Sequence, residues 1–112
     1  MTEKQFENKV KTFLGNNCWW LKTWSNGIQR QGVPDLLVCC NGYFVGIELK
    51  AEHGKPSALQ SWNIKKIREN GGFGMVLYPK DFEIFKNFIQ ALNAGLSYDV
   101  AKEKENEIWK IN

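Results

Sequence analysis

Two carboxylates and a lysine in this sequence are placed so that they could act together on one substrate. Asp35 stands at the start of an apolar run, and Glu48 and Lys50 stand at the end of the next one. Hard divalent cations prefer oxygen ligands, and Mg²⁺ commonly binds one or two protein carboxylates together with water and substrate phosphate. A lysine beside such a pair can position or deprotonate a water and stabilise developing negative charge. These residue types predict divalent metal chemistry.

A β-hairpin would bring the three side chains together. Asn41-Gly42, a strong signal for a two-residue hairpin turn, separates the apolar run 36–40 from a second run at 43–50. Because side chains alternate across a strand, Glu48 and Lys50 share one face of the second run, and the opposite face is wholly apolar. The apolar face would pack into a core, so the acid and the base would line a common cleft.

The motifs around these residues resemble a known nuclease family. Pro34-Asp35 followed by Glu48-Leu49-Lys50 matches the PD-(D/E)xK signature, which on its own arises by chance in many chains. Gly32, Gln60 and the glycine pair Gly71-Gly72 extend the match in the same order. Over about residues 3–81 the chain is similar to the virus-type replication-repair nuclease (VRR-NUC) domain in its stand-alone, phage-like form. The ordered set is much more specific than the signature alone.

The resemblance implies a Mg²⁺-dependent endodeoxyribonuclease that hydrolyses phosphodiester bonds, with Mn²⁺ as a substitute for Mg²⁺. The catalytic residues that it implies are Asp35, Glu48, Lys50 and Gln60, and the metal ligands that it implies are Glu7, Asp35, Glu48 and the carbonyl oxygen of Leu49. Stand-alone members of the family resemble Holliday-junction resolvases, which act as homodimers on branched DNA. We therefore expect a structure-selective enzyme for junction DNA that works as a homodimer.

Two of these side chains have a second interpretation. Gln60 with Ser57 fits a capping box, in which the glutamine amide reaches back to the start of a helix, and both roles can hold. Glu7 borders the apolar face of a predicted amphipathic helix, where it could instead form a surface pair with Lys11. Glu3, one turn earlier, is the alternative acid for the metal site.

Contacts with DNA have to come from a local patch, because the chain carries a net charge of only +3. A polar loop at 25–31 comes just before Pro34-Asp35, where it could meet the phosphate backbone without reading base sequence. A second loop leaves the strand that carries Glu48. The DNA-binding candidates in and near these two loops are Lys22, Ser25, Arg30, Gln31 and Lys55.

Other classes of function compete with this interpretation. His53 is the only histidine, which excludes nucleases that need a histidine base within a multi-ligand metal motif. A non-catalytic nucleic-acid-binding module would usually have lost one of Asp35, Glu48 and Lys50. A restriction-type endonuclease uses the same chemistry but reads base edges, and 112 residues leave little room for a recognition domain. The structure-selective nuclease is the leading hypothesis, and the binding module and the restriction-type enzyme are the alternatives.

Length and composition fit one α/β domain. The chain has 112 residues, of which 43% are hydrophobic and 13% aromatic, enough to build one core. The predicted order αβββαβα indicates a restriction-endonuclease-like fold, with a mixed central sheet flanked by helices. We assign residues 1–96 to the nuclease domain and 97–112 to a C-terminal helix or arm of the same domain. Apolar residues of the later helix and tail form a candidate dimer interface: Phe85, Phe88 and Trp109.

The cysteines and the amino-terminal residues indicate an intracellular protein. Three cysteines give an odd count without Cys-x-x-Cys spacing, so neither a disulfide framework nor a zinc site is predicted. Cys39 and Cys40 are expected to pack as small hydrophobic residues. The first residues are charged and no apolar run approaches ~18 residues, so we predict no signal peptide and no membrane span. We expect a cytoplasmic protein, and a nuclear or virus-infected setting is equally compatible.

Overall fold

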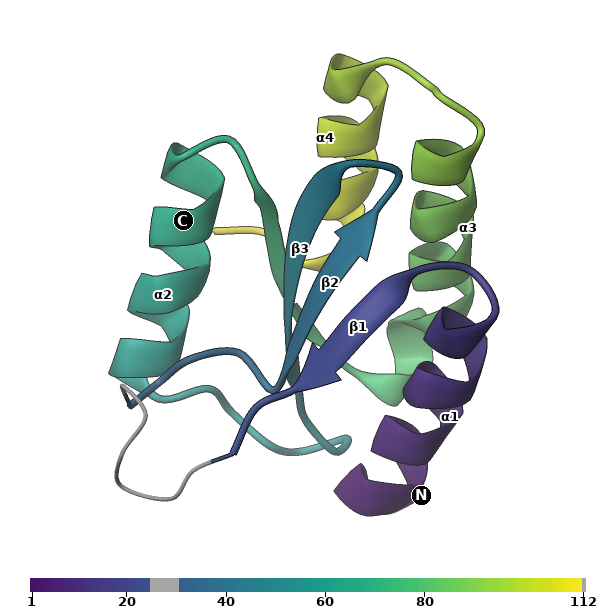
Figure 1. Cartoon of the computed structure of the whole chain (residues 1–112). Helices are drawn as coiled ribbons and strands as arrows, with labels where there is room; N and C mark the ends of the chain where they lie inside the picture. Colours follow the sequence, from purple (N-terminus) through teal and green to yellow (C-terminus); the bar gives the residue numbers. More distant parts are fainter. Residues whose placement is uncertain (25–30, 112) are drawn as a thin grey trace.

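The structure is a computed structural model that describes residues 1–24 and 31–111 (Figure 1). Its helices and strands are α1 (Glu3–Gly15), β1 (Trp19–Lys22), β2 (Leu36–Cys40), β3 (Tyr43–Leu49), α2 (Ala58–Glu69), β4 (Phe73–Leu77), the short 3-10 helix η1 (Pro79–Asp81), α3 (Phe82–Asn93) and α4 (Tyr98–Ile108). This order contains the predicted succession αβββαβα and adds α4 at its end. In the described part of the chain, no helix combines the length and the apolar character that crossing a membrane requires.

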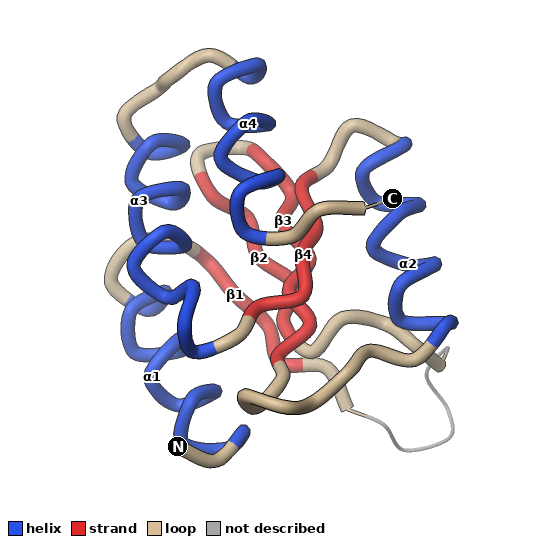
Figure 2. Tube along the Cα trace, turned by 180° about the vertical axis from the view of Figure 1, so that it is seen from behind, coloured by secondary structure: helices blue, strands red, loops and turns tan. Residues whose placement is uncertain are grey.

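The strands form one mixed sheet in the order β1-β2-β3-β4. The pairs β1–β2 and β2–β3 are antiparallel, and the pair β3–β4 is parallel. α2 connects β3 to β4 and covers one face of the sheet, whereas α1 and α3 lie on the other face, with α4 beside α3 along β4 (Figures 1 and 2). The predicted α/β class, a mixed central sheet flanked by helices, is confirmed.

The main core lies between the sheet and the layer of α1, α3 and α4. The predicted apolar face of β3 is buried there with aromatic and aliphatic residues of α1 and α3, namely Val45, Ile47, Leu49, Phe6, Val10, Phe85 and Phe88. The opposite face of β3 points toward α2. A Cβ atom at Gly46 would come within 2.7 Å of Ile67 Cδ1, so glycine at this position lets α2 approach the sheet closely.

The β2–β3 hairpin forms around the predicted turn. Asn41-Gly42 has positive φ at both residues, 49° and 87°, as a type I′ turn requires. The paired part of the hairpin ends with Leu36 opposite Ile47. One further step in this register places Asp35 opposite Glu48, so the fold of the hairpin itself brings the two carboxylates together.

Side chains from α2 and α4 cover the free edge of β4. Gly74 donates its N–H to Glu105 Oε2 (2.8 Å), and its carbonyl oxygen accepts a hydrogen bond from Arg68 Nε (2.7 Å). Arg68 Nε also lies 3.3 Å from Glu105 Oε2, and Lys102 Nζ lies 3.1 Å from Glu105 Oε1. Because these groups occupy the backbone donor and the backbone acceptor of Gly74, they oppose pairing of this edge with a strand of another molecule.

Two expectations about apolar residues are corrected. Phe85 and Phe88 are fully buried, and Trp109 is partly buried against the same core, so the predicted dimer interface on the later helix is wrong. The apolar stripe of α3 packs on the sheet of its own chain and is not available to a second copy. Cys40 is buried as expected, but Cys39 is exposed on the opposite face of β2.

Candidate active site

Asp35, Glu48 and Lys50 come together at one end of the β2–β3 hairpin. Asp35 Oδ2 accepts a hydrogen bond from the backbone N–H of Leu49 (2.9 Å). Lys50 Nζ lies 3.4 Å from Glu48 Oε2. Glu48 is 2% exposed, and its Oε1 finds no hydrogen-bond partner among the described residues. The site therefore holds two adjacent carboxylates, and one of their oxygens is buried without a hydrogen-bond partner among the described residues.

The environment of Glu48 opposes its negative charge. Burial raises the pKa of its carboxyl, and the neighbouring charge of Asp35 raises it further. Lys50 offsets only part of this rise, so the pKa of Glu48 is about 8. Near neutral pH the folded chain therefore keeps a proton on Glu48 unless a further positive charge approaches.

A divalent cation fits this pair of carboxylates on chemical grounds. A buried carboxylate oxygen without a hydrogen-bond partner is costly unless another group compensates for it. A cation beside Asp35 and Glu48 would satisfy Glu48 Oε1 and offset the repulsion between the two carboxylates. Mg²⁺ needs only one or two protein carboxylates. Within residues 1–24 and 31–111, no three His, Cys, Asp or Glu side chains gather as a metal cluster.

Glu7, the metal ligand expected from the first helix, is buried and surrounded by lysines. Its carboxylate forms ion pairs with Lys4 (3.0 Å), Lys11 (2.9 Å) and Lys22. Burial on its own raises the pKa of Glu7, but hydrogen bonds from the three lysines outweigh it and lower the pKa to about 2. The pair with Lys11 is thus present, as one of three such contacts.

Lys22 connects Glu7 to the hairpin carboxylates. Its Nζ donates to Glu7 Oε1 and lies 3.9 Å from Asp35 Oδ1. The structure brings Glu7 to the border of the site through this lysine, and Glu7, Asp35 and Glu48 do not form a three-carboxylate cluster in the described chain. Glu3, the alternative acid, is exposed on α1.

Gln60 forms a capping box at the start of α2. Its Oε1 accepts a hydrogen bond from the Ser57 N–H (2.8 Å), and its own N–H donates to Ser57 Oγ (3.1 Å). These two bonds satisfy backbone N–H groups that have no partner inside the helix. The capping interpretation is confirmed, and the catalytic role of Gln60 stays a prediction.

The candidates for DNA contact have different positions in the structure. Ser25 and Arg30 fall outside the described residues. Gln31 and Lys55 are exposed, so their side chains are accessible to a ligand. Lys22 is only partly exposed and already bonds Glu7, a pairing that sequence reasoning missed because the two residues come from different elements.

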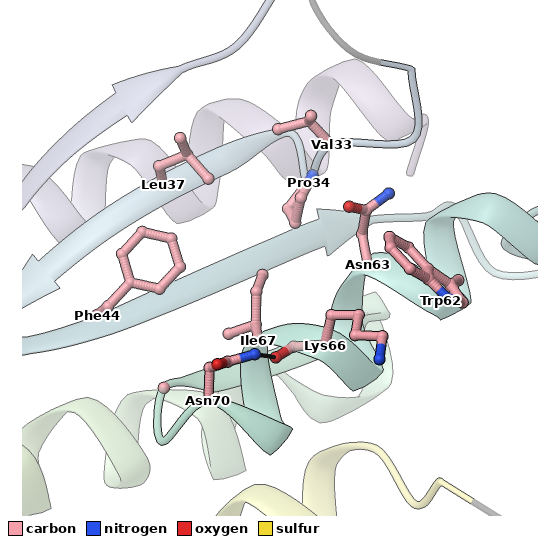
Figure 3. A pocket seen from close by; sticks show the side chains of 10 residues that line it. Val33, Pro34, Leu37, Phe44, Trp62, Asn63, Lys66, Ile67 and Asn70 are labelled. Atoms are coloured by element: carbon pink, nitrogen blue, oxygen red, sulfur yellow. Dashed lines mark hydrogen bonds between the residues drawn. The ribbon is translucent and has the colours of Figure 1, made fainter.

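A groove of about 590 Å³ opens between α2 and the β2–β3 hairpin, and we call it the α2 groove (Figure 3). Its lining residues are Val33, Pro34, Leu37, Phe44, Trp62, Asn63, Lys66, Ile67, Asn70 and Gly72. Pro34 directly precedes Asp35, so the groove adjoins the candidate active site along the chain. Sequence reasoning missed the groove, and its only local signal is Phe44, an aromatic residue on the strand face that carries Glu48.

No protein-family model matches this chain, and no curated protein matches it. The resemblance to the VRR-NUC domain therefore rests on the ordered motifs of the sequence. The case for a function rests on those motifs together with the geometry around Asp35 and Glu48.

Proposed function

We propose that this protein is a Mg²⁺-dependent DNA endonuclease that hydrolyses phosphodiester bonds. The observation that carries the proposal is the buried Glu48 Oε1, which lacks a hydrogen-bond partner among the described residues and lies beside Asp35. Asp35 and Glu48 would hold the metal, and the carbonyl oxygen of Leu49 is the further ligand that the family resemblance implies. When bound, Mg²⁺ neutralises phosphate charge and lowers the pKa of a water that can then attack.

The residues of the hairpin have separate tasks in this proposal. The Leu49 N–H holds Asp35 Oδ2, so the Asp35 carboxylate keeps one orientation. Lys50, at 3.4 Å from Glu48, can donate a hydrogen bond to the attacking water or to the phosphate oxygen on which charge develops. The apolar face of β3 packs into the core and thereby fixes the strand from which Glu48 projects.

We propose branched DNA as the substrate and a homodimer in the cytoplasm as the active form. We expect recognition to come from phosphate positions and DNA shape. Gln31 and Lys55 are exposed candidates for phosphate contacts. Symmetric cleavage of a four-way junction needs two active sites, and one chain supplies only one pair of Asp35 and Glu48.

Cleavage assays with matched DNA substrates test the proposal. The purified protein is incubated with Mg²⁺, Mn²⁺ or EDTA and with junction, flap and linear duplex DNA. We expect metal-dependent nicking that Glu48→Gln abolishes while DNA binding persists. Lys50→Ala should lower the rate by about 10²-fold, as for loss of a positioned acid–base group. Glu107→Gln, the same chemical change at an exposed position of α4, should leave the rate unchanged.

Two results would count against the proposal. Full activity of Glu48→Gln in Mg²⁺ would refute the metal-site assignment. Binding of branched DNA without cleavage in either metal would instead favour the alternative function, a non-catalytic nucleic-acid-binding module.

A further inference from the structure

The α2 groove combines apolar walls with polar groups at its rim (Figure 3). Its volume of about 590 Å³ lies within the range of small-ligand pockets. None of the ten residues that the described chain contributes to its lining carries a carboxylate. A ligand with a flat apolar body and a negative charge nearby would suit such a lining.

Two aromatic side chains border the α2 groove from different elements. Trp62 comes from α2 and Phe44 from β3 (Figure 3). Trp62 is 48% exposed and Phe44 is 44% exposed, whereas Ile64 on the same helix as Trp62 is fully buried. These partly exposed rings leave surface for a planar partner. Stacking of a nucleobase on such a ring strengthens the binding of single-stranded DNA.

Lys66 gives the rim of the groove a positive charge. Its Nζ lies 5.6 Å from the centroid of the Trp62 ring and 3.1 Å from Glu69 Oε2. Because exposed ion pairs contribute little to stability, Lys66 can exchange Glu69 for a phosphate at little cost. Asn63 and Asn70 also line the groove, and their side-chain nitrogens donate to the carbonyl oxygens of Leu59 (3.0 Å) and Lys66 (2.8 Å) in α2.

The α2 groove adjoins the candidate active site along two segments of the chain. Phe44 and Glu48 lie on the same face of β3, and four residues of strand span about 13 Å. Pro34 forms a wall of the groove, and Asp35 is the next residue of the chain. A DNA strand with one phosphate at Asp35 and Glu48 would therefore bring a neighbouring nucleotide to the groove.

We propose that the α2 groove binds an unpaired base of the DNA strand, stacked on Trp62, next to the phosphate that Asp35 and Glu48 would bind through a metal ion. This inference rests on the proposed function, because the proposed function identifies the ligand as DNA. It also implies that a nucleotide next to the branch point is unpaired or splayed in the bound DNA, because a base inside a duplex has both faces covered by its neighbours.

Binding of short single-stranded oligonucleotides tests this inference separately from cleavage. Fluorescence polarisation in EDTA gives the Kd for a labelled thymidine oligonucleotide and for an abasic one with the same phosphates. Trp62→Ala should weaken thymidine binding by about tenfold, the loss expected for one stacked base, and should leave abasic binding unchanged. Trp62→Phe should retain most of the affinity. Trp19→Ala removes a tryptophan that is 63% exposed on β1 and is the matched control.

The outcomes separate the groove from the nuclease activity. If Trp62→Ala and the unchanged protein bind the thymidine oligonucleotide with equal affinity, the proposal that the α2 groove binds a base is wrong. The proposal is also wrong if Trp62→Ala binds DNA normally but loses self-association in sedimentation. The groove would then be an interface between copies. A third outcome is that Trp62→Ala removes base-dependent binding while the unchanged protein shows no metal-dependent cleavage. This outcome would support base binding in the α2 groove and refute the proposed function.

Discussion

The environment of Glu48 in the folded chain disfavours the negative charge of its carboxylate. Its carboxyl is buried beside Asp35, and Lys50 compensates for only part of the unfavourable energy of its charge. The folded chain therefore binds this proton more tightly than the unfolded chain does. Groups with such displaced pKa values are concentrated at binding and catalytic sites.

We predict that in EDTA the free energy of unfolding falls as pH rises from about 4.5 to about 8 and levels off above that range. Between these values the unfolded chain has lost the Glu48 proton and the folded chain still holds it, so unfolding is favoured by up to about 1.4 kcal/mol per pH unit. Urea unfolding at a series of pH values measures this slope. Glu48→Gln should remove this contribution to the slope, and Glu107→Gln should keep it. An identical slope in Glu48→Gln would contradict the assignment.

Glu7 can act on the site as a metal ligand or through Lys22, and the geometry favours the second route. In Glu7→Gln the Lys22 ammonium loses a carboxylate partner and can pair more closely with Asp35, where it competes with a metal ion. We predict that Glu7→Gln raises the Mg²⁺ concentration for half-maximal cleavage by about fivefold, the factor that corresponds to ~1 kcal/mol. Glu3→Gln should leave this concentration nearly unchanged. Metal titrations of the cleavage rate measure both.

A second substitution separates the two routes for Glu7. Adding Lys22→Met to Glu7→Gln removes the competing ammonium. If Glu7 acts through Lys22, the double variant should regain the metal requirement of the unchanged protein. A metal requirement that stays raised in the double variant would show that Glu7 binds the metal itself.

At the level of helices and strands, features that depend on residues close together in the sequence could be predicted. Contacts between distant segments could not. The turn at Asn41-Gly42 and the capping box at Gln60 depend on residues a few positions apart, so the sequence predicted both. The apolar stripe of α3 was equally visible. A stripe does not reveal whether the sheet of its own chain or a second copy covers it, and Phe85 packs on its own sheet.

In the candidate site, too, local features could be predicted and contacts between different elements could not. Asp35, Glu48 and Lys50 could be predicted because two short motifs on adjacent strands carry them, and a hairpin turn fixes their register. The pairing of Lys22 with Glu7 joins two different elements, and so does the α2 groove, which has Trp62 among its lining residues. No helical or strand period in the sequence encodes such contacts.

The attachment of α4 to the sheet depends on Glu105, which is 1% exposed and pairs with Arg68 and Lys102. Glu105→Ala would leave the Arg68 guanidinium without its carboxylate and the Gly74 N–H without its acceptor. We predict a loss of about 3 kcal/mol in the free energy of unfolding, as for other broken buried ion pairs. Urea unfolding measures the loss. The exposed Glu107→Ala should change stability by less than about 0.5 kcal/mol, and an equally small change in Glu105→Ala would show that α4 is held by apolar contacts alone.

The dimensions of the whole molecule limit what one copy can reach on DNA. Its longest extent is 37 Å, about one helical turn of B-DNA. The chain is only mildly basic, with a net charge of +3, so under the proposed function its affinity for DNA would depend on a few local contacts with phosphates. Under the proposed function, one copy would place one pair of Asp35 and Glu48 at one strand of a branch point, and symmetric cleavage of two strands would require a second copy.

We predict a homodimer that nicks paired strands of a four-way junction in preference to linear duplex DNA. Because phosphate contacts dominate recognition, its affinity for the junction should fall steeply as salt rises. Sedimentation of the purified protein gives the oligomeric state, and cleavage of matched junction, flap and duplex substrates at one salt concentration gives the preference. Since Phe85 and Phe88 are buried, their substitution should affect stability and not association specifically. A strict monomer that cuts flaps or linear duplex as well as junctions would eliminate the resolvase hypothesis and leave only a broader nuclease for structured DNA.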